Sequence, residues 1–229
     1  MVNNLNILLP EIFLTLSIFS ILMIGVFIKD SFNLIFNLSS LIILLTIVII
    51  LNNSNNLEKI FLESFIRDPF SNFFKILILV SSLFVLNSSK NFILDNKLAK
   101  FEYPIIILLS ILGMFFMVSS NDIILFYLGL ELQSLSLYIL ASIDRDNLKS
   151  SESGIKYFVL SALSSGLLLY GCSLLYGFTG STNFDLIANE LVKENTGAVF
   201  AMVFILVGLA FKVSAVPFHM WTPDVYEGA

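Results

Sequence analysis

The sequence predicts an all-α integral membrane protein, and three observations lead to this class. Of the 229 residues, 57% are hydrophobic and only 13% are charged, whereas a soluble domain carries roughly 25% charged residues. The mean hydropathy of +0.93 leaves too little polar surface to cover a water-soluble globule. Long apolar stretches also recur along the whole chain, and in lipid such segments must be helical because the bilayer offers the backbone no hydrogen-bond partners.

The apolar stretches predict about seven membrane-spanning helices. A bilayer core of about 30 Å takes roughly 20 helical residues. The N-terminal stretch has no positively charged region and no small-residue cleavage site, so it is interpreted as a retained span rather than a signal peptide. In chain order the helices are expected at approximately 7–28, 32–51, 70–88, 103–119, 122–142, 153–177 and 196–217.

The first connections are polar and of unequal length. A tight turn joins the first two helices, and the middle of the loop 52–69 is expected to form a short surface helix. The loop 87–102 carries three lysines. The four residues "SSND" at 119–122 are so few that the fourth and fifth helices must form an antiparallel hairpin.

The later connections introduce the last two spans. In the polar segment 144–153, Ser150, Ser151 or Ser153 is a candidate helix N-cap. The longest break is 178–197, in which 184–194 has the amphipathic spacing of a helix that lies along a membrane surface.

Composition argues against several classes of function. The net charge is −5, and no Lys/Arg cluster is dense enough to follow a phosphate backbone, so nucleic acid is not expected as a partner. Cys172 is the single cysteine and is interpreted as a small core side chain. With one cysteine and one histidine, the chain offers too few ligands for haem or an iron–sulfur cluster. No dinucleotide, P-loop, C-x-x-C or H-E-x-x-H motif occurs. We therefore expect no cofactor, no metal and no redox chemistry in this chain.

Three charged residues lie where loops cannot explain them. Glu131 is near the centre of the fifth helix, Lys212 is well inside the seventh, and Lys156 is about one turn inside the sixth. A charge at the bilayer centre costs about 2.5–3.5 kcal/mol on insertion scales. Charges retained at this cost without a cofactor site indicate proton or ion transfer. Lys156 is close enough to the loop for the alternative of snorkelling to remain open.

Glu131 belongs to a polar stripe on its helix. Residues at i−4, i, i+3 and i+7 share one helical face, which here joins Glu131 to Tyr127, Ser134 and Tyr138. A hydroxyl-lined stripe cannot face lipid cheaply, so it is expected to face the protein interior. The functional interpretation is proton exchange at Glu131. The alternative is a structural carboxyl held by a tyrosine hydroxyl.

Lys212 lies in a similar setting. It shares a face with Gly208, Ala215 and His219, and the small residues leave room for water or a partner helix. Pro217 removes a backbone donor and is expected to break the helix, as happens where a membrane helix lines a substrate path. His219, the single histidine, either titrates near neutral pH or caps the helix break.

The remaining intramembrane polar residues suggest structural roles. Lys75 is expected to snorkel from the third helix, and Glu11 to lie at the membrane interface. Small residues on the sixth helix indicate close helix packing; they are Ser161, Ala162, Ser165 and Gly166.

Three segments carry a resemblance to a known family. They are "LELQSLSLYIL" (130–140), "ESGIKYFVLSALSSGLLLYGCSLLYGFTG" (152–180) and "GLAFKVSAVPFHMWTPDVYEGA" (208–229). They closely resemble subunit 2 of respiratory complex I, the NADH:ubiquinone oxidoreductase, which is called subunit N in bacteria. The resemblance implies an antiporter-like helix bundle with about fourteen helices in two inverted repeats and a discontinuous seventh helix.

The resemblance also implies roles for residues. Glu131 and Lys212 match the glutamate–lysine pair of the family's membrane midplane, and Lys156 matches a lysine of its proton path. Protons would move through these residues while quinone is reduced elsewhere in the complex. NADH, FMN, iron–sulfur clusters and ubiquinone would be bound by other subunits, and the partners would be other membrane-arm subunits and lipids.

The same resemblance divides the chain. Residues 1–120 would hold helices one to four, and 121–229 would hold helices five to seven, the first half of the proton-translocating module. The chain would then correspond to the N-terminal half of the family and be incomplete at Ala229. Either the protein is cut at this position or a second polypeptide supplies the missing helices.

Two other functions remain open. One is a subunit of a multi-subunit cation/proton antiporter, which uses the same glutamate and lysine chemistry. The other is a structural or receptor-like polytopic membrane protein. The frequent Phe, Ile, Leu and Asn suggest an A/T-rich genome, so the mitochondrial inner membrane is the expected location, with a bacterial plasma membrane as the alternative.

Overall fold

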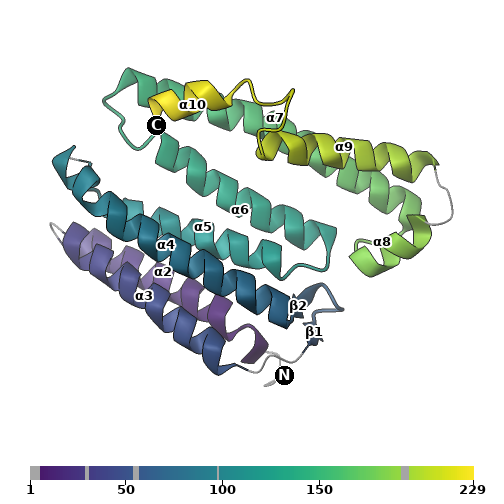
Figure 1. Ribbon diagram of the computed structural model, residues 1–229, viewed down its shortest axis with the longest axis horizontal. Coiled ribbons are helices and arrows are strands. Elements are labelled where there is room, and N and C mark those ends of the chain that lie inside the picture. The colour runs from purple at the N-terminus through teal and green to yellow at the C-terminus, as the bar shows by residue number, and fades with distance from the viewer. Residues whose placement is uncertain (1–5, 29–30, 54–56, 97, 192–195) are drawn as a thin grey trace. The chain divides into compact units, whose positions relative to one another are not determined.

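The computed structural model describes residues 6–28, 31–53, 57–96, 98–191 and 196–229, and helices dominate it (Figure 1). The chain folds as two compact units. The N-terminal unit comprises the residues up to Ser120 together with Leu128–Leu137, and the C-terminal unit comprises Asn121–Tyr127 together with Tyr138–Ala229. The predicted division of the chain into domains 1–120 and 121–229 stays a prediction.

The N-terminal unit is built from four long helices, a hairpin and the middle of α6. Helices α2, α3, α4 and α5 pack against one another (Figure 1). The elements are α2 (Leu9–Phe27), α3 (Phe32–Asn52), β1 (Glu58–Ile60), β2 (Phe65–Arg67), α4 (Pro69–Asp95), α5 (Glu102–Val118) and α6 (Ile123–Ala141).

The C-terminal unit is organised around α7. Helix α9 runs beside α7, and α10 packs on the same helix (Figure 1). The elements are α7 (Leu148–Thr179), α8 (Phe184–Leu191), α9 (Thr196–Lys212) and α10 (Thr222–Gly228). Helix α8 occupies the predicted amphipathic segment and buries Ile187, although residues 192–194 of that segment lie outside the described residues.

The predicted all-α membrane class is confirmed. Within the described residues, α2, α3, α4, α6 and α7 are long and apolar enough to cross a membrane, and α5 and α9 are apolar helices of 17 residues each. The break predicted in the seventh helix is also present, because α9 ends at Lys212 and the helix resumes as α10 at Thr222. Pro217 lies between these two helices.

Local sequence explains where several helices begin. The Asp68 carboxylate accepts a hydrogen bond from the Ser71 backbone, the Ser71 hydroxyl accepts one from the Asp68 backbone, and Pro69 occupies the first turn of α4. Asp122 caps α6 by accepting from the backbone N–H groups of Ile124 and Leu125. Such side-chain caps satisfy donors that the first helical turn leaves unpaired.

The turn before α6 produces the predicted antiparallel hairpin. Helices α5 and α6 approach backbone to backbone at two glycines. A Cβ atom on Gly113 would lie 2.7 Å from the Gly129 carbonyl oxygen, and one on Gly129 would lie 2.8 Å from the Gly113 carbonyl oxygen. Glycine is therefore required at both positions for this close packing.

The short surface helix predicted within 52–69 is wrong, because the described part of this segment contains a β-hairpin. Strands β1 and β2 pair antiparallel, with Lys59 opposite Ile66. The reversal is made by Phe61, Leu62 and Glu63, whose φ angles of 53°, 55° and 67° lie in the left-handed region. Residues of these types rarely adopt that region, so the sequence gives no turn signal.

Two predicted boundaries are also wrong. Helix α4 continues to Asp95 rather than ending near 88, because polar residues end a hydrophobic stretch without ending a helix. Asn147, rather than Ser150, Ser151 or Ser153, caps α7 by accepting from the Lys149 backbone N–H at 3.0 Å. The Ser150 and Ser153 hydroxyls instead donate to the Ala141 carbonyl.

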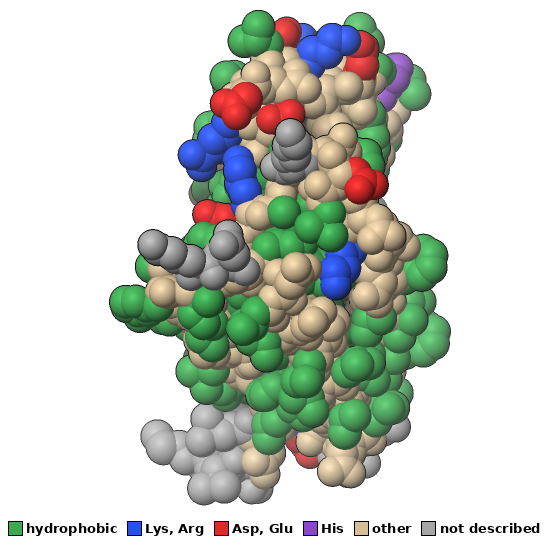
Figure 2. Space-filling view, turned by 90° about the vertical axis from the view of Figure 1, so that its left-hand side faces the viewer, with side chains coloured by type: hydrophobic (Ala, Val, Ile, Leu, Met, Phe, Trp, Pro, Cys, Tyr) green, Lys and Arg blue, Asp and Glu red, His purple; other side chains and the backbone are tan. Residues whose placement is uncertain are grey.

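The surface is rich in exposed hydrophobic side chains, which cover much of the face drawn in Figure 2. On α4 alone, Phe70, Phe73 and Phe84 are 64%, 62% and 72% exposed. Soluble monomers rarely expose contiguous apolar surface on this scale. Such a surface is typical of a chain with membrane-spanning helices.

Candidate functional site

Lys212, the last residue of α9, lies in a cluster of hydroxyl groups. Its Nζ donates to Tyr138 Oη at 3.0 Å and to Ser161 Oγ at 2.8 Å. Tyr138 Oη donates in turn to Ser161 Oγ at 2.5 Å. Tyr138 and Ser161 are 5% and 0% exposed, and Lys212 is half-buried. We call these three residues the lysine–hydroxyl cluster.

The chemistry of the cluster suits proton exchange. A hydroxyl both donates and accepts hydrogen bonds, so the Lys212 ammonium lies beside two groups of the kind that can relay a proton. The ammonium also lies 5.6 Å from the centroid of the Tyr138 ring, which attracts a cation electrostatically. Tyr157 packs edge-on against that ring, with centroids 4.7 Å apart, and thereby fixes its orientation.

Close packing of α7 against α9 places Lys212 beside Ser161. A Cβ atom on Gly208 would lie 2.6 Å from Leu168 Cβ, so the helices approach closely at this glycine. Ser164 Oγ donates to the Gly208 carbonyl at 3.1 Å across the same contact. Ser161 is one of the residues predicted to pack closely, but no pattern in the sequence indicates that its hydroxyl binds the lysine.

The helix break directly follows Lys212. Ser214 has a φ of 55°, its N–H bonds the Phe211 carbonyl, and the Ala215 N–H bonds the Ala210 carbonyl. This pattern is a Schellman motif, which usually has glycine at the left-handed position. Ser214 Oγ accepts from Thr222 Oγ1 at 2.9 Å, which links the motif to the start of α10. The helix therefore ends at Lys212 itself, before Pro217.

Aromatic stacking holds α10 next to the break. The ring of Trp221 stacks between Tyr157 and Phe211, with centroid distances of 4.7 and 5.6 Å. Trp221 and Val225 are buried with Ala141 in one small hydrophobic cluster. The predicted residue His219 is exposed in the segment between α9 and α10.

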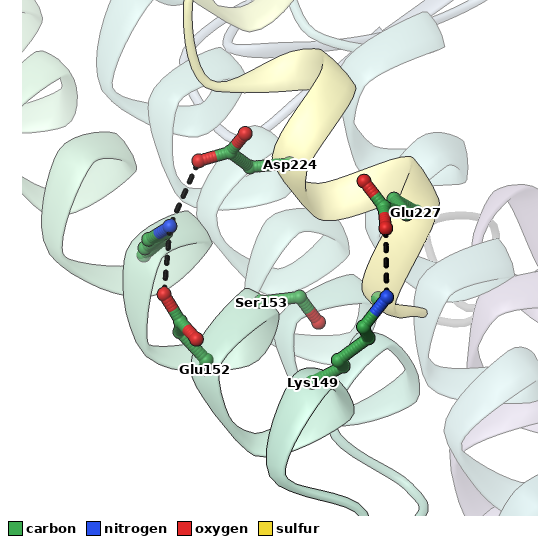
Figure 3. A pocket seen from close by; sticks show the side chains of 7 residues that line it. Lys149, Glu152, Ser153, Asp224 and Glu227 are labelled. Carbon is green, nitrogen blue, oxygen red and sulfur yellow. Dashed lines mark hydrogen bonds and ion pairs between the residues drawn. The ribbon is translucent and has the colours of Figure 1, made fainter.

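Lys156 lies between two carboxylates. Its Nζ is 2.8 Å from Glu152 on the preceding turn of α7 and 2.8 Å from Asp224 on α10 (Figure 3). The Lys156 side chain is 42% exposed. The structure thus places this predicted proton-path lysine in an ion-pair network, apart from the lysine–hydroxyl cluster.

A second ion pair joins the same two helices. Lys149 Nζ lies 2.8 Å from Glu227 Oε1, and Figure 3 shows this pair and the Lys156 network on the two sides of Ser153. These side chains line a hollow of about 180 Å³. The hydrogen bond and the charge of Lys149 lower the pKa of the Glu227 carboxyl below its ordinary value.

Glu131 is half-buried on α6 and belongs to the N-terminal unit. On the same helix, Ser134 is buried and its hydroxyl donates to the Leu130 carbonyl, and Tyr127 is half-buried. Of the four residues of the predicted stripe, the structure brings Tyr138 to Lys212. The pairing of Glu131 with Lys212 stays a prediction.

The structure reveals a charge pair that the sequence analysis interpreted wrongly. Lys75 does not snorkel, and Glu11 is buried within the protein, while its expected depth at the membrane interface stays a prediction. Their side chains form an ion pair of 2.6 Å between α2 and α4 and are 1% and 3% exposed. Burial is tolerated because each charge neutralises the other.

One signal in the sequence could have found this pair. Both residues lie near the N-terminal ends of their helices, and two membrane crossings separate those ends in the chain. The two ends therefore lie on the same side of the membrane, where opposite charges at similar depth can pair.

Comparison with known proteins supports the class that the fold and the lysine–hydroxyl cluster indicate. The family described as NADH:quinone oxidoreductase/Mrp antiporter, transmembrane, matches residues 120–229. This range contains the lysine–hydroxyl cluster, Glu131 and Lys156. The chain is a multi-pass membrane protein with an antiporter-like helix bundle.

The relatives specify the resemblance further. The chain is 56% identical over 228 residues to NADH-quinone oxidoreductase subunit N of Pelagibacter ubique, covering 99% of this chain and 48% of the relative. It is 51% identical to the subunit N of Bartonella bacilliformis, covering 99% and 47%. The resemblance to subunit 2 of complex I is thereby confirmed, since close homologues of this chain are NADH-quinone oxidoreductase subunits N. The chain spans about half the length of these relatives.

Solved structures agree with this fold. A chain of respiratory complex I from Thermus thermophilus superposes with a TM-score of 0.79 at 27% identity, covering 96% of this chain and 47% of that chain. A chain of the Mrp complex from Dietzia shares the fold alone, with a TM-score of 0.74 at 22% identity and coverage of 97% and 43%. The two named relatives are bacterial, which fits the alternative location, a bacterial plasma membrane, rather than the mitochondrial one.

Proposed function

We propose that this chain is part of an antiporter-like membrane-arm subunit of a proton-pumping NADH:quinone oxidoreductase, and that it moves protons through Lys212 and Glu131. The lysine–hydroxyl cluster carries the proposal. An ammonium that ends an apolar helix and bonds two buried hydroxyls is poised to exchange a proton and has no obvious value as a lipid anchor. The homologous subunits N supply the context of the complex.

The proposed mechanism is electrostatic. A change of charge near Lys212 or Glu131 alters how strongly each group holds its proton. In this proposal the two residues act as partners that associate and separate while quinone is reduced elsewhere. Tyr138 and Ser161 pass the proton to or from Lys212, and Tyr127 and Ser134 support Glu131.

Lys156 can take part in the proposed proton path only when it is released from its ion pairs. Its ammonium contacts Glu152 and Asp224 at 2.8 Å each, so a transfer role requires it to leave these carboxylates. We propose that Lys156 accepts or passes protons in a state in which α10 has moved from α7, which removes Asp224, and the lysine side chain has turned away from Glu152.

The partners follow from the same proposal. Other membrane-arm subunits and lipids surround the chain, and NADH, FMN, iron–sulfur clusters and ubiquinone bind to other subunits. The chain itself performs no redox step and no catalysis of its own. A second polypeptide that supplies further helices of the family stays a prediction.

The experiment uses the assembled complex in sealed membrane vesicles. Glu131→Gln and Lys212→Ala should each lower the number of protons pumped per NADH oxidised by about tenfold or more. The exposed residue Glu63 provides a control, and Glu63→Gln should pump normally. Intact pumping in both Glu131→Gln and Lys212→Ala would show that these residues are structural.

The cation/proton antiporter alternative has a separate outcome. The fold shared with the Mrp complex from Dietzia permits it, but the named relatives are NADH-quinone oxidoreductase subunits. Proton movement that depends on a sodium gradient and continues without NADH would favour the antiporter.

A further inference from the structure

The buried pair Glu11–Lys75 contacts more than its two helices. Lys75 Nζ lies 5.2 Å from the ring centroid of Phe65 in β2 and 5.6 Å from that of Phe115 in α5. Both rings are buried, at 2% and 0% exposure. One ammonium on α4 therefore contacts a carboxylate and two aromatic faces, which belong to three other elements of the N-terminal unit, α2, β2 and α5.

The Glu11 carboxylate depends on this lysine. Its Oε1 accepts the hydrogen bond from Lys75, while its Oε2 is buried without a hydrogen-bond partner among the described residues. If Lys75 were removed, no hydrogen bond to Oε2 from a described residue would offset the buried negative charge of Glu11. The loss of either partner is accordingly costly, whereas replacement of both by apolar side chains can be neutral.

The contacts of the pair lead to the turn before α6. Phe65 forms a β-bridge with Ser120, and the Ile66 N–H donates to the Ser119 carbonyl at 2.8 Å. The hairpin thus holds the chain between α5 and α6 directly.

A second connection leads to α6 itself. Phe115 is two residues from Gly113, whose backbone meets that of Gly129 on α6. Glu131 follows Gly129 by two residues. Through β2 and through α5, the charge pair contacts the elements that hold residues 119 and 120 and that pack against the part of α6 carrying Glu131.

We propose that Glu11 and Lys75 are positioning residues, whose buried ion pair holds the α5–α6 hairpin and thereby the carboxylate of Glu131 in place. This inference rests on the proposed role of Glu131 in proton transfer. It assigns the first and third spans a part in that function although neither carries a transferring group.

The test compares single and paired substitutions in the whole complex, in sealed vesicles. Glu11→Leu and Lys75→Met each leave one buried charge uncompensated. Each should lower the protons pumped per NADH by assembled complex about threefold to tenfold, and shift the pH at which pumping is half-maximal. The double variant Glu11→Leu/Lys75→Met should restore both quantities to within about twofold of the unmodified complex.

Controls and failures are distinguishable. Lys59–Glu63 is an exposed ion pair of 3.0 Å in the same hairpin region, so Glu63→Gln should leave pumping and its pH profile unchanged. If a single variant does not assemble, assembly and pumping of the double variant support the inference, and a double variant as defective as the singles overturns it.

The Glu131→Gln complex separates this inference from the proposed function. Loss of pumping in Glu131→Gln with normal pumping and pH profile in Glu11→Leu and Lys75→Met overturns the positioning role alone. Normal pumping in Glu131→Gln overturns the proposed function itself.

Discussion

At the scale of single residues, the Tyr138 hydroxyl is the group that joins α6 to Lys212. It accepts from the ammonium and donates to Ser161. Ser161 Oγ in turn accepts from both partners. The hydroxyls therefore help to fix the position of the ammonium, and the removal of one takes away one of these two hydrogen bonds.

We expect Tyr138→Phe to weaken the site. The substitution keeps the ring and removes its hydroxyl, which should destabilise the chain by about 1–3 kcal/mol because a hydrogen bond to a charged group is lost. Pumping should fall several-fold. Thermal unfolding in detergent and proton uptake by vesicles measure the two effects.

Tyr176→Phe is the matched control for this change. Tyr176 lies on α7 and is 54% exposed, so loss of its hydroxyl should alter neither stability nor pumping. Equal effects at Tyr138 and Tyr176 would contradict the assignment of the lysine–hydroxyl cluster.

At the scale of elements, the contact between α7 and α9 depends on Gly208, because glycine has no side chain. Gly208→Ala would place a methyl group 2.6 Å from Leu168 Cβ. We expect a loss of about 1–3 kcal/mol from overpacking, and displacement of Lys212 from Ser161. Unfolding by denaturant measures the first effect, and the pumping assay measures the second.

Gly166 offers a control on α7. A Cβ atom there would meet nothing within 4 Å, and Gly166→Ala should stabilise the helix by about 0.5–1 kcal/mol through helix propensity. Destabilisation by both substitutions to the same degree would show that close packing at Gly208 is not the cause.

The ion pairs of α10 predict a dependence on pH. Because the pKa of Glu227 is lowered in the folded chain by Lys149, the pair stabilises docking above the carboxyl's ordinary pKa. That contribution is lost as the pH falls through the lowered value. The protection of residues 222–228 against hydrogen exchange, taken relative to the intrinsic exchange rate at each pH, should therefore fall at acidic pH.

Two comparisons test the cause of that change. Glu227→Gln should exchange faster than the unmodified chain near neutral pH and show a smaller loss of protection on acidification. High salt should act in the same direction because these groups are exposed and ions screen them. If the protection of α10 against hydrogen exchange did not change with pH, with salt or in Glu227→Gln, the packing of Trp221 and Val225 would be sufficient to hold α10.

At the scale of the whole molecule, hydropathy predicted the helices because membrane spans must be apolar and helical. Hydropathy did not predict the β1–β2 hairpin or the end of α4, because neither depends on how apolar the residues are. The β1–β2 hairpin depends on left-handed φ angles at Phe61, Leu62 and Glu63, which their residue types do not suggest. The end of α4 depends on backbone hydrogen bonds that continue through polar residues.

The site was predictable to the extent that charge in an apolar helix is unusual. Lys212 and Tyr138 were found in this way. The role of Ser161 was not, because a serine in a membrane helix is inexpensive whether it packs or binds. Glu11 and Lys75 were placed singly by their distance from the helix ends, whereas the fold pairs them across two helices.

Because Trp221 stacks next to the helix break that follows Lys212, its fluorescence reports on the structure of that break. Trp221 is the single tryptophan of the chain, and it lies buried between Tyr157 and Phe211. Intrinsic fluorescence of this chain, excited selectively at the indole, therefore comes from one place, the junction of α9 and α10. A red shift of its emission would report departure of α10 without any attached dye, and could be followed in real time during turnover wherever this chain is the sole source of indole emission.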